Sequence, residues 1–505
     1  MTDIASARTP GQFHQRLGID PEEQQTFLVN IRKKQWDISM LQHDSESEEN
    51  SIMPVNCNRS RLSRLAVALL LTLAAPLALA DNLQQIFTLA AEKDPEIRQA
   101  RARYNASHTV IDQGRSQLLP SISATASTSR DTTGVASSPL GRPMQEHSFG
   151  AGFNSKGYGL NLRQAVLNFQ AWYAFQAARK GDQQAALTLA QSEQALIIKV
   201  ATAYFNVLRS QANLASFVAE EAAAKQVLDQ TQQRFEVGLV AITDVYDSQA
   251  NADLASVNLL VEENNLNQRL EALEAITGQQ HLELAALSEN FPIVLVDPAN
   301  MAEWVTLAQN NNLAIKIAEL DLAAREDDAK AAKSAMYPTV DLSMNYNWNQ
   351  SANPFSFFPS LASERSSVAL NFTMPLFAGG LNRSRMHQAY YTRDASEEAL
   401  LRSRRDNTQS TRNAWRSVET DVKAVQARAQ AIVSAQSSLE ATTVGAEVGT
   451  RNIVDVVLSQ RLLFQTQRDH ANARFTYVLD TLTLKQAAGV LSPQDVQDLN
   501  QWLQE

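Results

Sequence analysis

The chain has 505 residues, of which 44% are hydrophobic and 19% charged, and its formal net charge is −10. This acidic balance, together with the lack of a Lys/Arg run, excludes nucleic acid as a partner. Only 15 Pro and 17 Gly occur in the whole chain, which favours long helices over many turns.

The N-terminal part of the chain contains one long run of mainly apolar residues, 65–80, which follows three arginines and ends in Ala-Leu-Ala. A positively charged flank, a short apolar core and a cleavage motif of small residues predict a secretory signal peptide over 53–80, cleaved after Ala80. A retained membrane anchor is the alternative, but the run is shorter than the roughly 20 residues that a membrane helix needs. We expect residues 1–52 to be an upstream extension, either disordered or mis-started, because Met53 begins a signal peptide of ordinary length.

The first half of the predicted exported chain, 81–290, contains two candidate strands and a long helical region. Alternating apolar residues predict strands at about 120–130 and 157–167. Residues 182–278 carry an apolar seam with three-and-four spacing, which is typical of coiled-coil packing. We expect two antiparallel helices there, of about 55 and 40 residues and ~60–80 Å long, that turn near Val237 and Gly238.

The second half, 291–490, repeats this plan, and a C-terminal segment follows at 491–505. Strands are predicted at about 339–350 and 366–377, and long helices over 381–489. RFEVGLVAITDVYDSQ (234–249) corresponds to AEVGTRNIVDVVLSQ (446–460) at an offset that also relates Gly278 to Gly489. An internal duplication is the simplest account of these matches.

The candidate strands have the length that a membrane-spanning β-barrel requires, about 9–11 residues. No segment after Ala80 is a candidate membrane helix, whereas an exported protein can cross an outer membrane as a closed barrel. Four strands are too few, since about eight is the practical minimum. If the strands span lipid, several chains must therefore share one barrel. The alternative is a soluble four-stranded sheet that packs its apolar face on a core.

Several stretches of the chain resemble the TolC outer-membrane channel family, from residue 81 to about 499. They are ATAYFNVL (201–208), LDQTQQRFEVGLVAITDV (228–245), ITGQQHLELAAL (276–287), IVSAQSSLEA (432–441), VGTRNIVDV (448–456) and HANARFTY (470–477). The resemblance implies an α+β membrane protein that forms a homotrimer. Its twelve-stranded β-barrel, with four strands per chain, continues into a long α-helical coiled-coil barrel across the periplasm.

The same resemblance implies the function of an outer-membrane exit duct that conducts its cargo passively. The cargo is small molecules, secreted proteins or both, as in multidrug efflux and type I secretion. The implied partners are a periplasmic adaptor protein, an inner-membrane pump of the ABC, RND or MFS type, and outer-membrane lipid.

The resemblance also assigns roles to residues near the two helix turns. Val237, Gly238 and Leu239, with Val448, Gly449 and Thr450, match the turns that contact the adaptor. Thr243, Asp244, Arg451 and Asp455 match polar residues that tether or constrict the periplasmic entrance. Ala446 stands where a tethering tyrosine is common in the family, and Leu458 where a second constriction aspartate is common. Without the resemblance, Asp244 and Asp455 are ordinary candidates for helix N-caps.

No pattern in the chain predicts an enzyme, a cofactor or a metal site. The histidines after residue 80 are scattered, without HExxH or paired-ligand spacing, and are expected on surfaces or helix faces. A GxxxxGK[ST] phosphate loop is also missing. Two non-enzymatic alternatives remain: a trimeric surface adhesin and a periplasmic coiled-coil scaffold. Adhesins place their four strands together at one end of the chain, whereas these strands are divided between two repeats.

Overall fold

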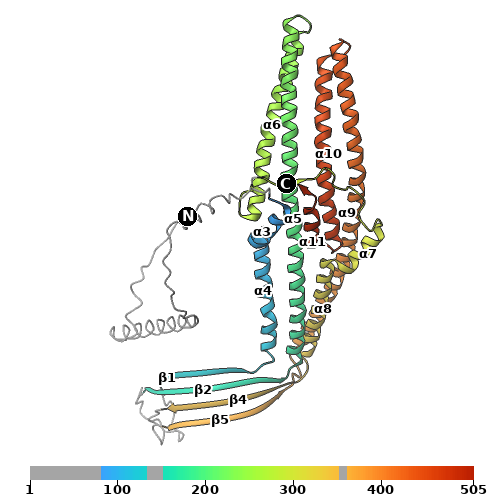
Figure 1. Cartoon of the computed structure of the whole chain (residues 1–505). Helices are drawn as coiled ribbons and strands as arrows, with labels where there is room; N and C mark the ends of the chain where they lie inside the picture. Colours follow the sequence, from blue (N-terminus) through green and yellow to red (C-terminus); the bar gives the residue numbers. More distant parts are fainter. Residues whose placement is uncertain (1–80, 133–151, 282, 352–360, 505) are drawn as a thin grey trace, which may run out of the picture. The chain divides into compact units, whose positions relative to one another are not determined.

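A computed structural model describes residues 81–132, 152–281, 283–351 and 361–504 (Figure 1). All of them belong to one structural unit, Ala78–Glu505. The predicted upstream extension, 1–52, and the predicted signal peptide, 53–80, lie outside the described residues.

Four long strands form one antiparallel sheet in the order β1-β2-β4-β5. The strands are β1 (Ser121–Thr132), β2 (Gly152–Leu167), β4 (Thr339–Ser351) and β5 (Leu361–Thr373). Each half of the chain contributes one hairpin, and β2 pairs with β4 along almost their full length. β1 and β5 are therefore the two edges of the sheet, and they run in opposite directions.

The register of the sheet separates an apolar face from a polar face, because successive side chains of a strand point to opposite sides. Ile122 pairs with Leu162, Leu162 with Met344, and Met344 with Val368. The same face carries further apolar residues: Tyr158, Leu160, Leu342, Tyr346, Trp348, Leu370 and Phe372. The opposite face carries Ser, Thr and Asn, and Arg163 pairs there with Asp341 at 3.3 Å. Val368, Leu370 and Phe372 remain 67–70% exposed in the chain.

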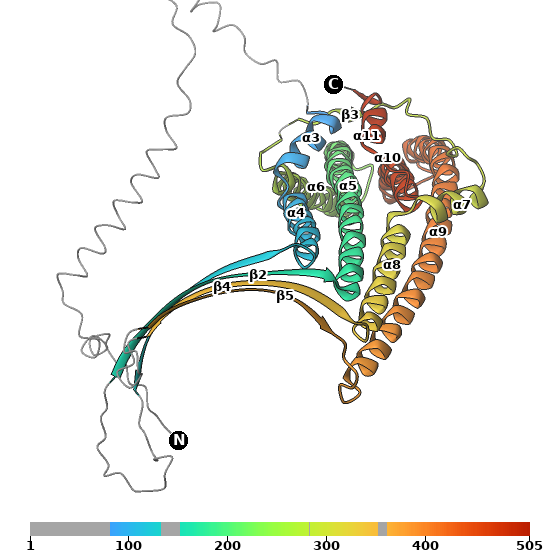
Figure 2. The same cartoon turned by 90° about the horizontal axis from the view of Figure 1, so that it is seen from below.

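Four helices adjoin the sheet and lie side by side in the same order as the strands they connect to (Figure 2). These helices are α4 (Pro95–Ser116), α5 (Phe169–Glu236), α8 (Leu313–Ser334) and α9 (Leu381–Glu447). Asp94, Asn168 and Asn312 cap the first three, and each accepts a hydrogen bond from a backbone N–H of the first turn. The order of the sheet is thus continued by the helical layer.

Beyond this layer the chain forms two long antiparallel hairpins, α5 with α6 (Ile242–Thr277) and α9 with α10 (Ile453–Ala487). At 1.5 Å per residue, α5 and α9 are each about 100 Å long. Such helices depend on side-chain packing along their length rather than on helix propensity alone. None of the helices in the described part of the chain has the length and hydropathy that crossing a membrane requires.

Shorter elements surround the middle of the long helices (Figure 1). They are α3 (Leu83–Lys93), α7 (Met301–Asn311), α11 (Pro493–Asn500) and a small sheet of β3 (Ala286–Leu287) with β6 (Leu503–Gln504). The largest apolar cluster lies at this level, where Tyr204 and Phe205 of α5 are fully buried. This core joins α3, α5, α6 and α10 into one body.

Three element boundaries differ clearly from those expected from the sequence, and one of them is the start of β2, at Gly152 rather than near 157. The first long helix begins at Phe169 rather than near 182, because Asn168 caps it directly after β2. The last strand lies at 361–373 rather than 366–377. Pro375 cannot donate a ladder hydrogen bond, whereas the polar residues before 366 continue the pairing with β4. Met374, an expected strand residue, therefore follows the end of β5.

Candidate functional site

The residues singled out from the sequence gather at the two helix turns farthest from the sheet (Figure 1). We name the turn of Val237, Gly238 and Leu239 the first tip, and that of Val448, Gly449 and Thr450 the second tip. The first joins α5 to α6, and the second joins α9 to α10. The apolar side chains at the tips are 69–73% exposed, namely Val237, Leu239 and Val448. Exposed apolar residues at a helix end are available to a partner.

Glycine is required at the centre of both tips by the backbone. Gly238 and Gly449 each have φ of +80°, a left-handed conformation that residues with a Cβ rarely adopt. The N–H of Leu239 donates to the carbonyl of Arg234, and that of Thr450 donates to the carbonyl of Gly445. These bonds satisfy carbonyl groups that the helix ends leave open. The two halves of the chain therefore build the same turn.

The two aspartates near the tips are not the helix N-caps that their position suggested. Asn452 caps α10, and its Oδ1 accepts a hydrogen bond of 2.9 Å from the backbone N–H of Asp455. Ala241 precedes α6 without a side-chain cap, and Asp244 lies in the first turn. Both carboxylates are half-buried, and each lies where the helix dipole favours negative charge.

Arg451 forms an ion pair directly after the second tip. Its Nη1 lies 3.8 Å from Oδ2 of Asp455, four residues later in the chain. The two side chains are 63% and 38% exposed, so the pair is worth only about 0.2–1 kcal/mol. Within the described residues of this single chain, Arg451 makes no ion pair with Asp244.

The remaining candidate residues lie in the helix turns next to the two tips. Thr243 and Leu458 are exposed, and Leu458 lies one helical turn after Asp455. Ala446 is half-buried in the last turn of α9. The first turns of α10 thus present one acidic side chain, Asp455, beside an apolar one, Leu458.

A pair of hydroxyl contacts near the tips was not anticipated from the sequence. Ser248 bonds to Thr231 at 3.3 Å across the first hairpin, and Ser459 bonds to Thr442 at 3.2 Å across the second. The same offset that relates Gly238 to Gly449 also relates these two pairs. Aligning the two halves for repeated hydroxyl residues could have found them. Each pair ties the two helices of a hairpin together about two turns from its tip.

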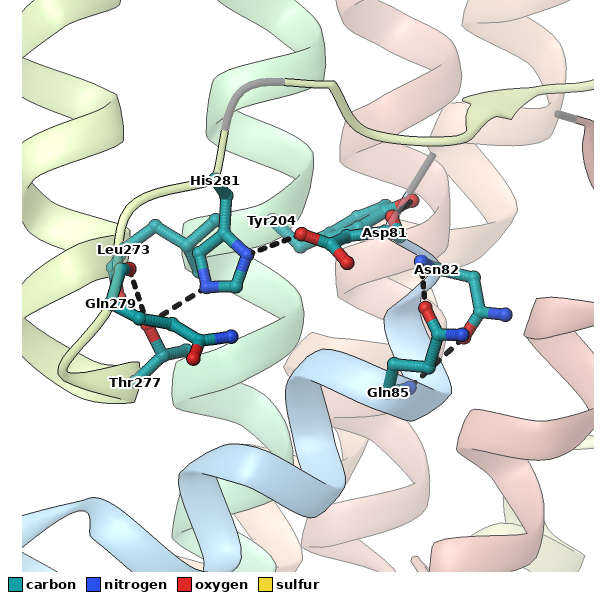
Figure 3. Close-up of polar contacts among 8 residues, drawn as sticks. All are labelled: Asp81, Asn82, Gln85, Tyr204, Leu273, Thr277, Gln279 and His281. Atoms are coloured by element: carbon teal, nitrogen blue, oxygen red, sulfur yellow. Dashed lines mark hydrogen bonds and ion pairs between the residues drawn. The ribbon is translucent and has the colours of Figure 1, made fainter. Parts of the chain in front are cut away.

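His281 contradicts the expectation that the histidines lie on surfaces or helix faces, because it is only 5% exposed. Figure 3 shows its Nδ1 directed at Asp81 Oδ2 at 2.7 Å and its Nε2 directed at Thr277 Oγ1 at 2.9 Å. Tyr204 donates from its hydroxyl to the carbonyl of Ala285 at 2.7 Å, and burial raises the pKa of this phenol. The sequence could not reveal this contact, since Asp81 precedes His281 by 200 residues.

The hydrogen-bonded series Thr277–His281–Asp81 resembles a nucleophilic triad, but the site around it does not suit catalysis. Thr277 is fully buried, and its hydroxyl also contacts the carbonyls of Leu273 and Gln279. A nucleophile needs an exposed oxygen and room for a substrate. The cluster instead holds Asp81 against the loop after α6, where Asp81 also pairs with Leu284.

Other polar groups in the described chain do not form a reactive constellation. A groove of about 600 Å³ runs along α9 and is lined by arginines, namely Arg404, Arg405, Arg412 and Arg416, with amide and hydroxyl side chains. It is open to solvent and lacks a paired acid and base. Among the described residues, no three His, Cys, Asp or Glu side chains are placed to hold a metal ion.

Comparison with known proteins agrees with this geometry. The family described as "Outer membrane efflux protein" matches residues 86–279 and 304–490. The outer membrane protein TolC of Vibrio cholerae is 34% identical over 83% of this chain and 93% of its own length. The alkaline protease secretion protein AprF of Pseudomonas aeruginosa is 24% identical over 83% of this chain and 87% of its own length.

A solved structure shares the fold. The outer membrane protein VceC of Vibrio cholerae superposes with a TM-score of 0.68 at 18% identity, covering 81% of this chain and 96% of VceC. The family match spans both halves of the chain, including both tips and both long hairpins in full. The chain therefore belongs to the outer membrane efflux protein family.

Proposed function

We propose that the chain is one subunit of a homotrimeric exit duct that spans the outer membrane and the periplasm. In this proposal the duct conducts small molecules, secreted proteins or both, without an energy source of its own. The apolar face that crosses all four strands of the sheet carries the proposal. Val368, Leu370 and Phe372 expose that face, which a water-soluble sheet would cover with helices or a second sheet.

The two free edges of the sheet favour closure through further copies. β1 and β5 run in opposite directions, so β5 of one copy can pair with β1 of the next in the antiparallel manner of the whole sheet. Three copies would supply twelve strands and leave no edge, whereas one copy is far below the minimum for a barrel. The polar face, with the Arg163–Asp341 pair, would then line the interior.

The long hairpins would continue the barrel as a helical tunnel across the periplasm. At about 100 Å, α5 and α9 are long enough to extend far beyond the sheet. We infer that the two tips contact a periplasmic adaptor and that an inner-membrane pump of the ABC, RND or MFS type supplies the energy. The exposed apolar residues of the tips, Val237, Leu239 and Val448, support this contact.

We further infer that Asp455, Leu458 and Arg451, with Asp244, Thr243 and Ala446 nearby, form the closed entrance. Three copies of Asp455 around one axis would attract cations. The two halves, 81–290 and 291–490, would descend from one duplicated unit, as the equal turns and hydroxyl pairs suggest. The family match weighs against the adhesin and scaffold alternatives.

Two measurements on the protein extracted from membranes test the proposal. Its mass in detergent should be that of three chains, and heating should release monomers. In planar lipid bilayers it should form ion-conducting channels without added nucleotide. A monomer that retains its full β content, or a trimer that never conducts, would disprove the duct.

A further inference from the structure

Arg468 of α10 reaches across to α5 and forms a buried ion pair with Glu220. Its Nη1 lies 2.5 Å from Oε2 of Glu220 and 3.3 Å from the hydroxyl of Ser216. The guanidinium carbon lies 4.1 Å from the centre of the Phe217 ring, within the range of a cation–π contact. The two charged side chains are only 14% and 10% exposed.

This contact joins the two helical hairpins, which belong to different halves of the chain. Two other side-chain bridges between the long helices of the hairpins occur in the described residues. Arg209 bonds to Thr476 near the middle of α5, and Arg461 bonds to Asn251 closer to the tips. Both of these have a neutral acceptor. Of the three bridges, Arg468–Glu220 is the one that joins two opposite charges, and both of its side chains are mostly buried.

A buried ion pair specifies geometry more than it adds stability, because each charge loses its hydration and is compensated only in one arrangement. Sliding or rotating α10 on α5 would leave Arg468 and Glu220 buried without a partner. The pair therefore fixes both the register and the rotation of α10. Phe217 and Ser216 restrict the guanidinium further from two sides.

The orientation of α10 at this point determines where its tip residues point. Asp455 precedes Arg468 by 13 residues, which is about 20 Å along the helix and roughly 3.6 turns. Asp455 therefore lies on nearly the opposite side of α10 from Arg468. With Arg468 held against α5, Asp455 is turned away from the first hairpin of its own chain.

We propose that Arg468 and Glu220 are positioning residues for the entrance, which hold α10 on α5 and thereby set the resting place of Asp455 and Leu458. This inference rests on the proposed function, because it requires a duct with a closed end at the tips. Between this pair and the tip, Arg461–Asn251 is the remaining polar bridge to the other hairpin in the described residues. The tip segment can then move about the Arg468–Glu220 pair while the middle of the bundle stays assembled.

Single-channel recording on the purified trimer tests the proposal, with Arg468→Gln, Glu220→Gln and the charge exchange of both residues. We expect the mean conductance to rise roughly two- to tenfold in each single variant, because losing a buried pair shifts a two-state equilibrium by at least that factor. The cation preference should change in parallel, and the charge exchange should restore both quantities towards wild type. Lys423→Gln is the matched control, since Lys423 pairs with Glu419 on the exposed surface of α9.

The thermal dissociation temperature of the trimer, measured on the same samples, separates positioning from a purely structural role. Lower heat stability with wild-type conductance and cation preference in both single variants would overturn the inference. If Arg468→Gln fails to assemble, Glu220→Gln alone breaks the pair, and wild-type conductance and cation preference in that variant would equally overturn the inference. A wild-type protein that forms no channel would instead count against the proposed function.

Discussion

Placing an arginine at the centre of the apolar sheet face should prevent stable insertion into lipid, whereas the same change one residue earlier should be tolerated. β5 has 13 residues, and at ~3.3 Å each and a tilt of ~45° it covers about 30 Å, the thickness of the hydrocarbon core. Val368 is the eighth of these residues. It lies in the row that crosses the sheet through Met344, Leu162 and Ile122.

The magnitude follows from that central position. An arginine on the lipid face at the bilayer midplane costs about 2–4 kcal/mol, and each copy in a ring would bear this cost. Ser367→Arg is the matched control, because Ser367 pairs with Asn345 on the polar face. On the polar face, which also carries the Arg163–Asp341 pair, an added arginine would remain in contact with water.

Urea titration of the protein folded into phospholipid vesicles measures the difference. Val368→Arg should unfold at a clearly lower urea concentration than wild type, while Ser367→Arg should unfold close to it. Equal losses of stability in the two variants would show that the two faces do not differ in environment. The assignment of the apolar face to lipid would then be wrong.

The remaining predictions concern the helices. Arg451→Ser should raise the single-channel conductance, because it removes a pair worth about 0.2–1 kcal/mol that holds the Asp455 carboxylate in the proposed closed entrance; an unchanged conductance would remove Arg451 from the entrance. Asp455→Asn should abolish both cation preference and block by multivalent cations, since three carboxylates around one axis attract cations; survival of both effects would place the selectivity elsewhere. Burial and the neighbouring carboxylate of Asp480 raise the pKa of Asp421 from 3.8 to about 6. The folded state therefore holds this proton more tightly than the unfolded state, so this contribution to stability is full below about pH 4 and is lost as the pH rises to about 6. Thermal melts in detergent across this range should show that loss in wild type and not in Asp421→Asn; identical pH profiles would show that Asp421 does not contribute.

The bounds of the strands could be predicted where apolar and polar side chains alternate. They could be predicted less well where only backbone pairing determines how far a strand extends. In β4 the alternation from Val340 to Trp348 indicates a strand within one residue of its observed bounds. β5 keeps pairing through Glu364, opposite Trp348, although its apolar pattern has ended there. Its backbone continues the ladder because β4 offers unpaired groups, which the sequence of β5 alone cannot indicate.

The long helices could be predicted from their seam, but not their beginning. The first three turns of α5, from Phe169, pack between α4 and α8 in a layer of four helices rather than in a two-helix coiled coil. That environment requires apolar and small residues on more than one side, so the three-and-four spacing disappears there. The helix start instead depends on Asn168, whose cap lies directly at the end of β2.

The candidate entrance shows why contacts are harder to predict than positions. The repeat places Asp244 and Asp455 at equivalent points of two turns, and the structure has each in the first turn of its helix. Their partners do not follow from this equivalence. Arg451 meets Asp455 because four residues make one helical turn, whereas Asp244 has the neutral Val240 at the corresponding place. The two halves thus share a backbone and differ in charge, so among the described residues Asp455 has an ion-pair partner four residues before it and Asp244 does not.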